Sequence, residues 1–412
     1  MRFCLNRHPP GEAEWFPLRR LMKDFSISKK GNKSATIVIL IILILAICIF
    51  FIPSKIFQPS WDFRNNLWAP SYLLVNHMSP YNIKVVFEFS NAVWMPMIIG
   101  LFFPLGYLPL QWASNIWLLI NLASLFLIIF VIAKTPRESG ILILLILFSL
   151  LIFPSTVTNF TLGQVSLEIC LALLILTKYR NNLKPIVIGL LISITLTKPQ
   201  LVVLFLPTYL IMSFREQGVK YSSKIIIYIL IWTAVLCAPL FIFFPNWIPD
   251  FLSNLATNNT WFYPTLYAFL VSNFGLRTMT LSLAGIYLVI GLMVSIFLSI
   301  KLDKFEALLW VLAITPLFSP IVWSWDFVLL YPLMIFMVLE KKSVVSSRIT
   351  YSGYVICTII FIVMRSTGHI SEHFTFWIPV FLISVLLLSR ISKNFGQVSK
   401  VTPKVSNKPY NY

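Results

Sequence analysis

The sequence predicts an all-α polytopic membrane protein with about twelve transmembrane helices and a long first outer loop. Hydrophobic residues make up 58% of the chain and charged residues only 11%, whereas a soluble globular domain has roughly 25% charged residues. Apolar runs at 35–52, 225–244 and 279–300 approach or exceed the roughly 20 residues that cross a bilayer as a helix. The third observation is the distribution of the basic residues.

The basic residues gather on one side when the spans are numbered alternately from a cytoplasmic N-terminus. Of the 32 Lys and Arg residues, 26 then fall on the cytoplasmic side and six on the other. This is the positive-inside bias of membrane proteins, so the net charge of +18 needs no nucleic-acid partner. We therefore expect a plasma-membrane protein with both termini in the cytoplasm and with membrane lipid around it.

Three parts are expected along the chain. A basic cytoplasmic segment, 1–34, precedes the transmembrane domain, 35–390, and a basic tail, 391–412, is expected to be disordered. The expected spans are 35–52, 111–133, 139–153, 165–177, 185–197, 199–213, 225–244, 279–300, 305–318, 326–339, 349–365 and 374–389. The first outer loop is 53–91. The proline-broken stretch 92–109 after it is expected to form a short or re-entrant helix.

Polar residues of the outer side gather at two places in the first half of the chain. Asp62 lies close to Arg64 at the head of the first outer loop, where a carboxylate can deprotonate a hydroxyl group; the alternative is a hydrated loop with two solvated charges. Asn159 and Gln164 flank Gly163, which allows a tight turn. Gln164 can both donate and accept hydrogen bonds, but a simple helix-capping loop has the same pattern.

Two further clusters follow. Lys198 lies directly before Pro199, at a helix break in apolar surroundings, where it is either a snorkelling lysine or a phosphate anchor. Trp323 and Asp326 lie at the junction of two late spans, a position that also suits an interfacial tryptophan belt with one solvated carboxylate. The five cysteines show no C-x-x-C spacing and the His residues no H-E-x-x-H pattern, so neither a disulfide framework nor a metal site is expected.

The order of these motifs carries a resemblance to a known family. The motifs are Asp62 with a later Ser79-Pro80-Tyr81, the apolar-proline stretch 94–109, Asn115-Ile-Trp117, Gly163-Gln164-Val165, Gly189 followed by Lys198-Pro199, and Ser319-Pro320-x-x-Trp323. They resemble the polyprenyl-phosphate-dependent glycosyltransferases of family 87, GT-C fold membrane enzymes that include the α-1,2-mannosyltransferases of phosphatidylinositol mannoside synthesis. The resemblance covers roughly 35–340. Ser166 stands where the family often has Asn, and Trp325 and Asp326 stand where it often has His.

The resemblance implies a GT-C-like bundle that transfers a hexose from a polyprenyl-phosphate sugar to a lipid or glycan acceptor. Mannose is the expected hexose, because the family includes mannosyltransferases. The transfer would take place on the non-cytoplasmic face and would invert the configuration at the anomeric carbon of the sugar. Asp62 is expected to be the general base, and Lys198 to balance the charge of the departing phosphate. No cofactor and no divalent metal is expected, because the leaving group is already an anionic phosphate.

The remaining candidates are expected to contact the substrates. Arg64 would orient the base or meet the phosphate. Gln164, Asn159 and Tyr81 would hydrogen-bond sugar hydroxyls. Trp323 would stack on the sugar or pack against the isoprenoid chain, and Asp326 would substitute for the histidine of the family. A transporter or flippase of lipid-linked precursors has the same span count and is the alternative function, and a lipid-linked polymer ligase or polymerase shares the donor class.

Overall fold

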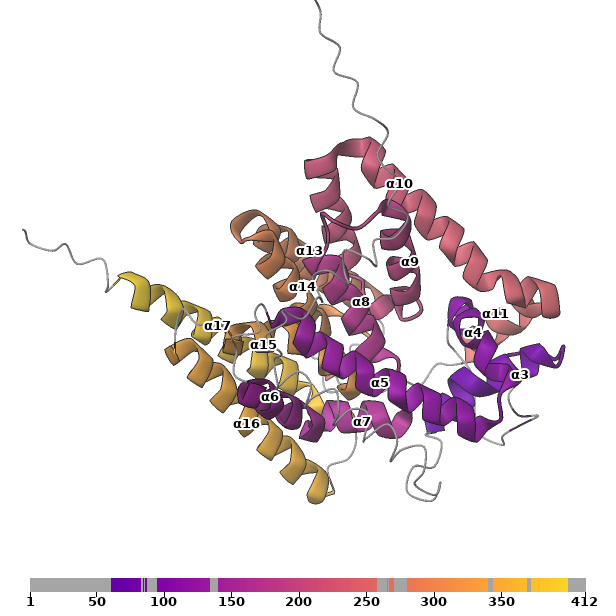
Figure 1. The fold of residues 1–412 in the computed structure, drawn as a ribbon, viewed down its shortest axis with the longest axis horizontal. Coiled ribbons are helices and arrows are strands. Elements are labelled where there is room, and N and C mark those ends of the chain that lie inside the picture. Colours follow the sequence, from indigo (N-terminus) through magenta and orange to yellow (C-terminus); the bar gives the residue numbers. More distant parts are fainter. Residues whose placement is uncertain are drawn as a thin grey trace, which may run out of the picture.

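The computed structural model describes residues 61–82, 84, 86, 95–133, 140–257, 265, 267–269, 280–339, 344–368 and 372–398. Within these ranges every regular element is a helix (Figure 1). The expected basic segment 1–34 and the expected first span 35–52 lie outside them, as do 399–412 of the expected tail. The helical class predicted from the sequence is therefore confirmed.

The elements follow one another along the chain, with η marking π- and 3₁₀-helices. In the first half they are η1 (Phe63–Trp68), α3 (Ala69–Val75), α4 (Pro96–Phe102), η3 (Phe103–Tyr107), α5 (Leu110–Ile132), α6 (Gly140–Ile152), α7 (Pro154–Leu162), α8 (Ser166–Lys178), α9 (Pro185–Thr195) and η4 (Pro199–Leu201). In the second half they are α10 (Phe205–Phe243), α11 (Trp247–Thr257), α13 (Thr280–Lys301), α14 (Lys304–Phe318), η6 (Ser324–Leu330), α15 (Tyr331–Leu339), α16 (Val344–Ser366), η7 (Glu372–Thr375) and α17 (Trp377–Val398).

Prolines begin several of these helices. Pro96, Pro154 and Pro185 occupy the first position of α4, α7 and α9. Proline suits that position because its fixed φ is helical and the backbone N–H that it lacks would have no intrahelical partner there. These three prolines thus mark helix starts and divide apolar sequence into short helices.

Four helices in the described part of the chain, α5, α10, α13 and α16, are long and apolar enough to cross a membrane. Helices α6 and α7 form a fifth candidate span if taken together, with a bend of 66° between them. Within the described ranges, the spans expected at 165–177, 185–197, 305–318, 326–339 and 374–389 correspond to α8, α9, α14, η6 with α15, and α17, none of which meets the same test. The protein is therefore polytopic and membrane-embedded, while the count of twelve spans stays a prediction.

The helix boundaries differ from the expected ones in three places. The spans expected at 199–213 and 225–244 are joined in α10, which runs over 39 residues and is interrupted at Gly218, where φ is 79°. The first outer loop, for which no helix was predicted, contains η1 and α3. Helix α17 continues to Val398, so the start of the expected tail is helical.

The ion pairs in the described ranges fall into two groups. The first joins residues that we assigned to the cytoplasmic side: Arg180–Glu216, Lys304–Glu216 and Arg390–Glu306. The second joins residues assigned to the outer side: Lys198–Asp326 and Arg365–Glu372. None of these pairs links the two groups, as expected when polar residues lie at opposite ends of a helical bundle.

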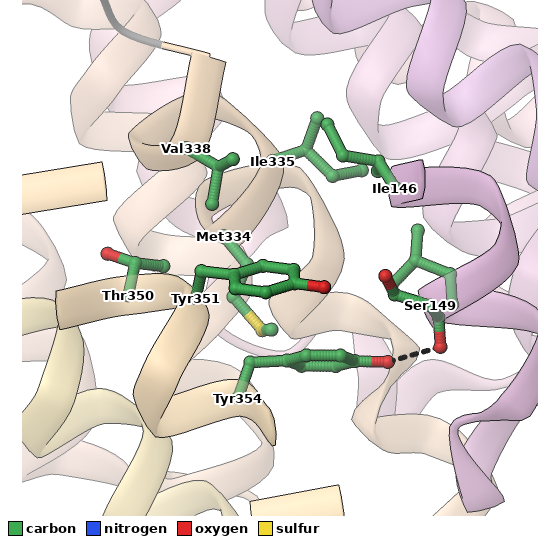
Figure 2. A pocket seen from close by; sticks show the side chains of 9 residues that line it. Ile146, Ser149, Met334, Ile335, Val338, Thr350, Tyr351 and Tyr354 are labelled. Carbon is green, nitrogen blue, oxygen red and sulfur yellow. Dashed lines mark hydrogen bonds between the residues drawn. The ribbon is translucent and has the colours of Figure 1, made fainter. Parts of the chain in front are cut away.

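A small pocket separates α6, α15 and α16 (Figure 2). Its lining includes Ile146, Met334, Val338 and Tyr354, and the Tyr354 hydroxyl donates a hydrogen bond of 2.6 Å to the carbonyl of Ser149. No charged side chain lines it. This pocket therefore belongs to the packing of α16 against the bundle, and its lining has no carboxylate, histidine or lysine side chain.

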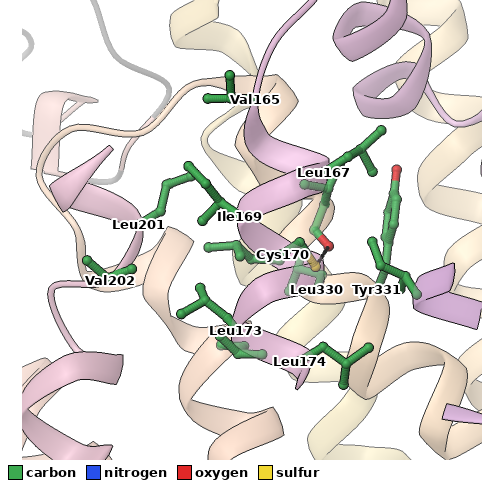
Figure 3. Close-up of a cluster of buried hydrophobic side chains, with 14 of the residues drawn as sticks. Val165, Leu167, Ile169, Cys170, Leu173, Leu174, Leu201, Val202, Leu330 and Tyr331 are labelled. Carbon is green, nitrogen blue, oxygen red and sulfur yellow. Dashed lines mark hydrogen bonds between the residues drawn. The ribbon is translucent and has the colours of Figure 1, made fainter. Parts of the chain in front are cut away.

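Helix α8 lies inside the bundle, where it packs against α5, α9, α14 and η6. Figure 3 shows Leu167, Cys170 and Leu174 of α8 among Leu201 and Leu330 from the neighbouring segments. All five side chains are 0% exposed. This apolar contact holds the first residue of α8 in place, and the candidate site begins there.

Close helix packing gives a first testable prediction. A Cβ atom on Gly189 of α9 would lie 2.5 Å from Cβ of Tyr228 in α10, whereas one on Gly285 of α13 would meet nothing within 4 Å. We expect Gly189→Ala to lower the midpoint of thermal unfolding in detergent. Gly285→Ala should leave it unchanged or raise it, because alanine is favoured over glycine in a helix by about 1 kcal/mol. Equal midpoints in the two variants would contradict the close contact between α9 and α10.

Candidate active site

The turn between α7 and α8 places Gln164 and Ser166 side by side in the interior. Gly163 ends α7 with φ 69° and ψ 44°, a left-handed conformation that glycine adopts without steric cost. The backbone N–H groups of Gly163 and Gln164 both donate to the carbonyl of Asn159, at 2.8 and 3.0 Å. The indole of Trp117 in α5 donates to the Gly163 carbonyl at 2.9 Å. The turn is thus fixed from both sides.

A second break between helices, after α9, places Lys198 next to Gln164 and Ser166. Helix α9 ends at Thr195, and Pro199 disfavours helical backbone at the residue before it, so Lys198 has φ −127° and ψ 77°. The residue is only 4% exposed. Its ammonium group donates to Oε1 of Gln164 at 3.0 Å, to Oγ of Ser166 at 3.0 Å and to Oδ1 of Asp326 at 2.8 Å. These three bonds match the three N–H donors of a lysine.

Asp326 in η6 closes the buried ion pair. Its side chain is 0% exposed, and besides Lys198 it accepts a hydrogen bond of 2.5 Å from Oγ of Ser166 on Oδ1. Oδ2 accepts from the backbone N–H of Trp323 at 3.0 Å, while the N–H of Asp326 donates back to the Trp323 carbonyl at 2.9 Å. These two hydrogen bonds between Trp323 and Asp326 fix the turn that begins η6.

Asp62 lies at the other end of this hydrogen-bonded chain, directly before η1. Oδ2 accepts from Nε2 of Gln164 at 2.5 Å, and Oδ1 accepts from Nδ2 of Asn66 at 2.9 Å. Burial raises the pKa of Asp62 above its ordinary value, and the bonds from Gln164 and Asn66 together with the charge of Lys198 oppose this increase. Asp62 itself is half-buried, and its neighbour Trp61 is 49% exposed.

We name the set Asp62, Gln164, Ser166, Lys198 and Asp326 the polar chain. Four of its members were singled out from the sequence in four separate clusters, and the structure brings all of them into one hydrogen-bonded network. Ser166 had been noted as a departure from the family pattern and had been given no role of its own. The polar chain therefore connects segments that lie as far as 264 positions apart, from 62 to 326.

Two aromatic rings border the polar chain. Trp323 and Trp325 stack with ring centroids 4.9 Å apart and an interplanar angle of 7°. The ammonium of Lys198 lies 5.9 Å from the ring centroid of Trp325, within the range of a cation–π contact. Asn159 donates to the Trp325 carbonyl at 2.7 Å and to the Ser155 carbonyl at 2.9 Å, so its amide nitrogen holds η6 against α7.

The remaining two candidates, Arg64 and Tyr81, have their described contacts with residues outside the polar chain. Nε of Arg64 donates to Oδ1 of Asn65 at 2.9 Å. Tyr81 packs against Phe251 of α11 with ring centroids 5.5 Å apart, and its carbonyl accepts from Asn254. The buried hydroxyl of Tyr81 makes no hydrogen bond in the described structure.

One contributor, Asn66, was missed in the sequence, and Trp325 was named without being given a role. Asn66 lies four residues after Asp62, the spacing that puts two side chains on one face of a helix, but the segment was interpreted as a loop. Glu168, in the first turn of α8, has both carboxylate oxygens buried without a hydrogen bond. No group of three or more His, Cys, Asp and Glu side chains that would hold a metal ion occurs in the described ranges.

The comparison with protein families decides the class of the protein. The model of glycosyltransferase family 87 matches residues 95–320, which is more than half of the chain. The chain belongs to glycosyltransferase family 87. It is therefore a membrane glycosyltransferase, with a donor and an acceptor as substrates. The match includes Gln164, Ser166 and Lys198 of the polar chain, while Asp62 and Asp326 lie outside it. Neither a curated protein nor a solved structure shows significant similarity to this family 87 chain.

The buried ion pair gives a second testable prediction. Lys198 and Asp326 are 5% and 0% exposed, so Asp326→Asn leaves a buried cation without a counter-charge. The expected loss is about 3–5 kcal/mol, the usual cost of removing one partner of a buried pair. The double variant Lys198→Met/Asp326→Leu should recover most of this loss, because both charges are then absent. Thermal unfolding of the purified protein in detergent measures both effects.

Arg365→Gln provides the matched control, since it breaks an ion pair whose side chains are 32% and 18% exposed. This pair is partly exposed, and pairs that water reaches contribute about 1 kcal/mol or less, so this variant should unfold much closer to the wild type than Asp326→Asn. A double variant as unstable as Asp326→Asn would show that hydrogen bonds around the pair, and not its charges, stabilise the fold.

Proposed function

We propose that this family 87 enzyme transfers a hexose, mannose foremost, from a polyprenyl-phosphate donor to a hydroxyl group of a lipid or glycan acceptor. We place the reaction at the non-cytoplasmic face of the plasma membrane, with inversion at the anomeric carbon and Asp62 as the general base. One observation supports this most: the carboxylate of Asp62, next to the exposed Trp61, is connected through Gln164 to the buried cation Lys198.

The carboxylate of Asp62 has the capacity to accept a proton in this arrangement. Each of its oxygens receives one hydrogen bond, from Gln164 or from Asn66, and a carboxylate oxygen has two lone pairs. One acceptor position on each oxygen is thus left for a substrate hydroxyl. As that hydroxyl oxygen bonds to the anomeric carbon, its proton moves to Asp62, and the bond from that carbon to the phosphate oxygen breaks with its electron pair on the phosphate.

Lys198 is the cation that we assign to the departing phosphate. Its three donors are bound to Gln164, Ser166 and Asp326, so a phosphate oxygen would have to replace one of them. Positive charge aimed at the position where negative charge develops is usually the largest contribution to such catalysis. The stacked pair of Trp323 and Trp325 beside this cation would supply the flat apolar surface for the sugar or the isoprenoid chain.

Asp62→Asn tests the assignment of the base. The amide keeps the shape of the side chain but cannot take up the proton, and a general base contributes typically 10²–10⁴-fold to the rate. We expect transfer of radiolabelled mannose from polyprenyl-phosphate mannose to native lipid extract to fall by about this factor. Asp250→Asn is the control, because Asp250 receives a hydrogen bond from Ser79 and has no part in the polar chain.

Other polyprenyl-phosphate sugars, tested in parallel, identify the sugar. Wild-type transfer that survives in Asp62→Asn would move the base to another carboxylate of this enzyme. If the wild type transfers none of these sugars but moves lipid-linked precursors across vesicles, the transporter alternative replaces the proposal.

The pH dependence of kcat/KM provides an independent prediction. Burial raises the pKa of Asp62, so this carboxyl stays protonated, and inactive as a base, up to a higher pH than a free aspartate. We therefore expect the activity to fall on acidification at a pH above the ordinary aspartate value of about 3.9. Asn66→Ala removes a hydrogen bond that lowers the pKa, so it should move the acidic limb to still higher pH. An acidic limb that does not move in this variant would exclude Asp62 as the titrating group.

A further inference from the structure

Both ends of the Gln164 amide are bonded inside the protein. Oε1 accepts from Nζ of Lys198 at 3.0 Å, and Nε2 donates to Oδ2 of Asp62 at 2.5 Å. Lysine only donates and an ionised aspartate only accepts, so the two neighbours fix which end of the amide faces which residue. Gln164 itself is 2% exposed. These contacts leave it poorly placed to hydrogen-bond a sugar hydroxyl, the role expected from the sequence.

Gln164 is also the structural link between two parts of the chain. Asp62 belongs to the η1 segment, whose Phe63 packs on Phe102 and Trp117, while Lys198 belongs to the break after α9. The bond from Gln164 is the contact that fixes Oδ2 of Asp62 from across the bundle, because Asn66 holds Oδ1 from within the same turn of helix.

Lys198 is the charged side chain that acts on Asp62 from outside its own segment. The elements packed against η1 are α3, α4, η3 and α5, and their titratable side chains are Tyr72 and Tyr107, which are not among the groups that act on Asp62. Arg64, on η1 itself, is bonded to Asn65. The charge that the base experiences thus comes from the same lysine that orients Gln164.

We propose that Gln164 is a positioning residue of the transfer reaction: held in one orientation by Lys198, it aligns the Asp62 carboxylate with the acceptor hydroxyl. This inference rests on the proposed function. In this inference Gln164 contacts the base, Asp62, and does not contact the sugar. The Lys198–Asp326 pair then holds Gln164, and through it the base, in addition to lying next to the phosphate. Gln164 does not itself take part in bond making or proton transfer.

The test compares Gln164→Leu and Gln164→Glu with the wild type in steady-state kinetics over a range of pH. Gln164→Leu frees the Asp62 carboxylate, so kcat should fall by about 10²-fold, as is typical of a misplaced reacting group, with little change in the KM for the donor. Gln164→Glu keeps an acceptor for Lys198 but faces Asp62 with a second carboxylate. It should move the acidic limb of kcat/KM to higher pH, because like charges favour the protonated form.

Combination with Asp62→Asn separates the two roles of Gln164. A positioning residue acts through the base, so Gln164→Leu should cost little further activity once Asp62 is Asn, and the two effects should not multiply. Multiplying losses, or a rise in donor KM with unchanged kcat and an unchanged pH profile, would show that Gln164 contacts the sugar and would overturn the inference. Gln111→Leu, at the start of α5, is the matched control for loss of a partly buried glutamine.

A spectroscopic readout keeps the inference separate from the proposed function. In infrared difference spectra recorded during an acid titration, the carbonyl band that disappears in Asp62→Asn belongs to protonated Asp62. This band should change its midpoint in Gln164→Leu and Gln164→Glu but not in Gln111→Leu. A shifted midpoint without sugar transfer would contradict the proposed function and keep the contact between Gln164 and Asp62, whereas an unshifted midpoint with transfer would overturn the inference alone.

Discussion

The buried ion pair between Lys198 and Asp326 is the interaction on which the rest of the site depends. Both side chains are almost completely shielded from solvent, and a single buried charge costs several kcal/mol unless a partner of opposite sign and further hydrogen bonds compensate it. Here Ser166 and the backbone of Trp323 provide these bonds. Any conformation that separates α8, the α9 break and η6 would leave at least one charge without a partner, so the pair fixes the mutual position of three segments.

The segments meet because the chain interrupts its helices where polar side chains are needed. Gly163 ends α7 in a left-handed conformation, and Pro199 excludes helical backbone at Lys198. At such breaks backbone groups lose their intrahelical partners and side chains lose their regular spacing. In an apolar bundle these are the positions where polar groups can approach one another, while the uninterrupted helices around them, such as α5, provide the apolar packing.

The sequence predicted the helical class, the membrane environment and the clusters from which the site is built, because hydropathy, basic-residue distribution and helix-breaking residues are local signals. It did not predict that Gln164 would bind Asp62 on one side and Lys198 on the other, since contacts between segments depend on how the helices pack. Asn66 was missed for a related reason. The stretch after Asp62 has the prolines and asparagines of a loop, but Phe63 and Leu67 are buried by the helices around them, and this tertiary packing stabilises η1.

The charges of the polar chain explain why a neutral amide stands in its middle. Asp62 and Asp326 are two carboxylates around one lysine, and a donor phosphate would add further negative charge. If Asp62 paired directly with Lys198, the cation would be shared between the base and the phosphate, and a base so stabilised would be a weaker proton acceptor. Through Gln164 the carboxylate receives one hydrogen bond and only part of the effect of the lysine charge, while burial keeps its pKa raised. The arrangement therefore holds Asp62, the base that we propose, in a fixed position without neutralising it, and in this proposal the lysine serves Asp326 and an incoming anion.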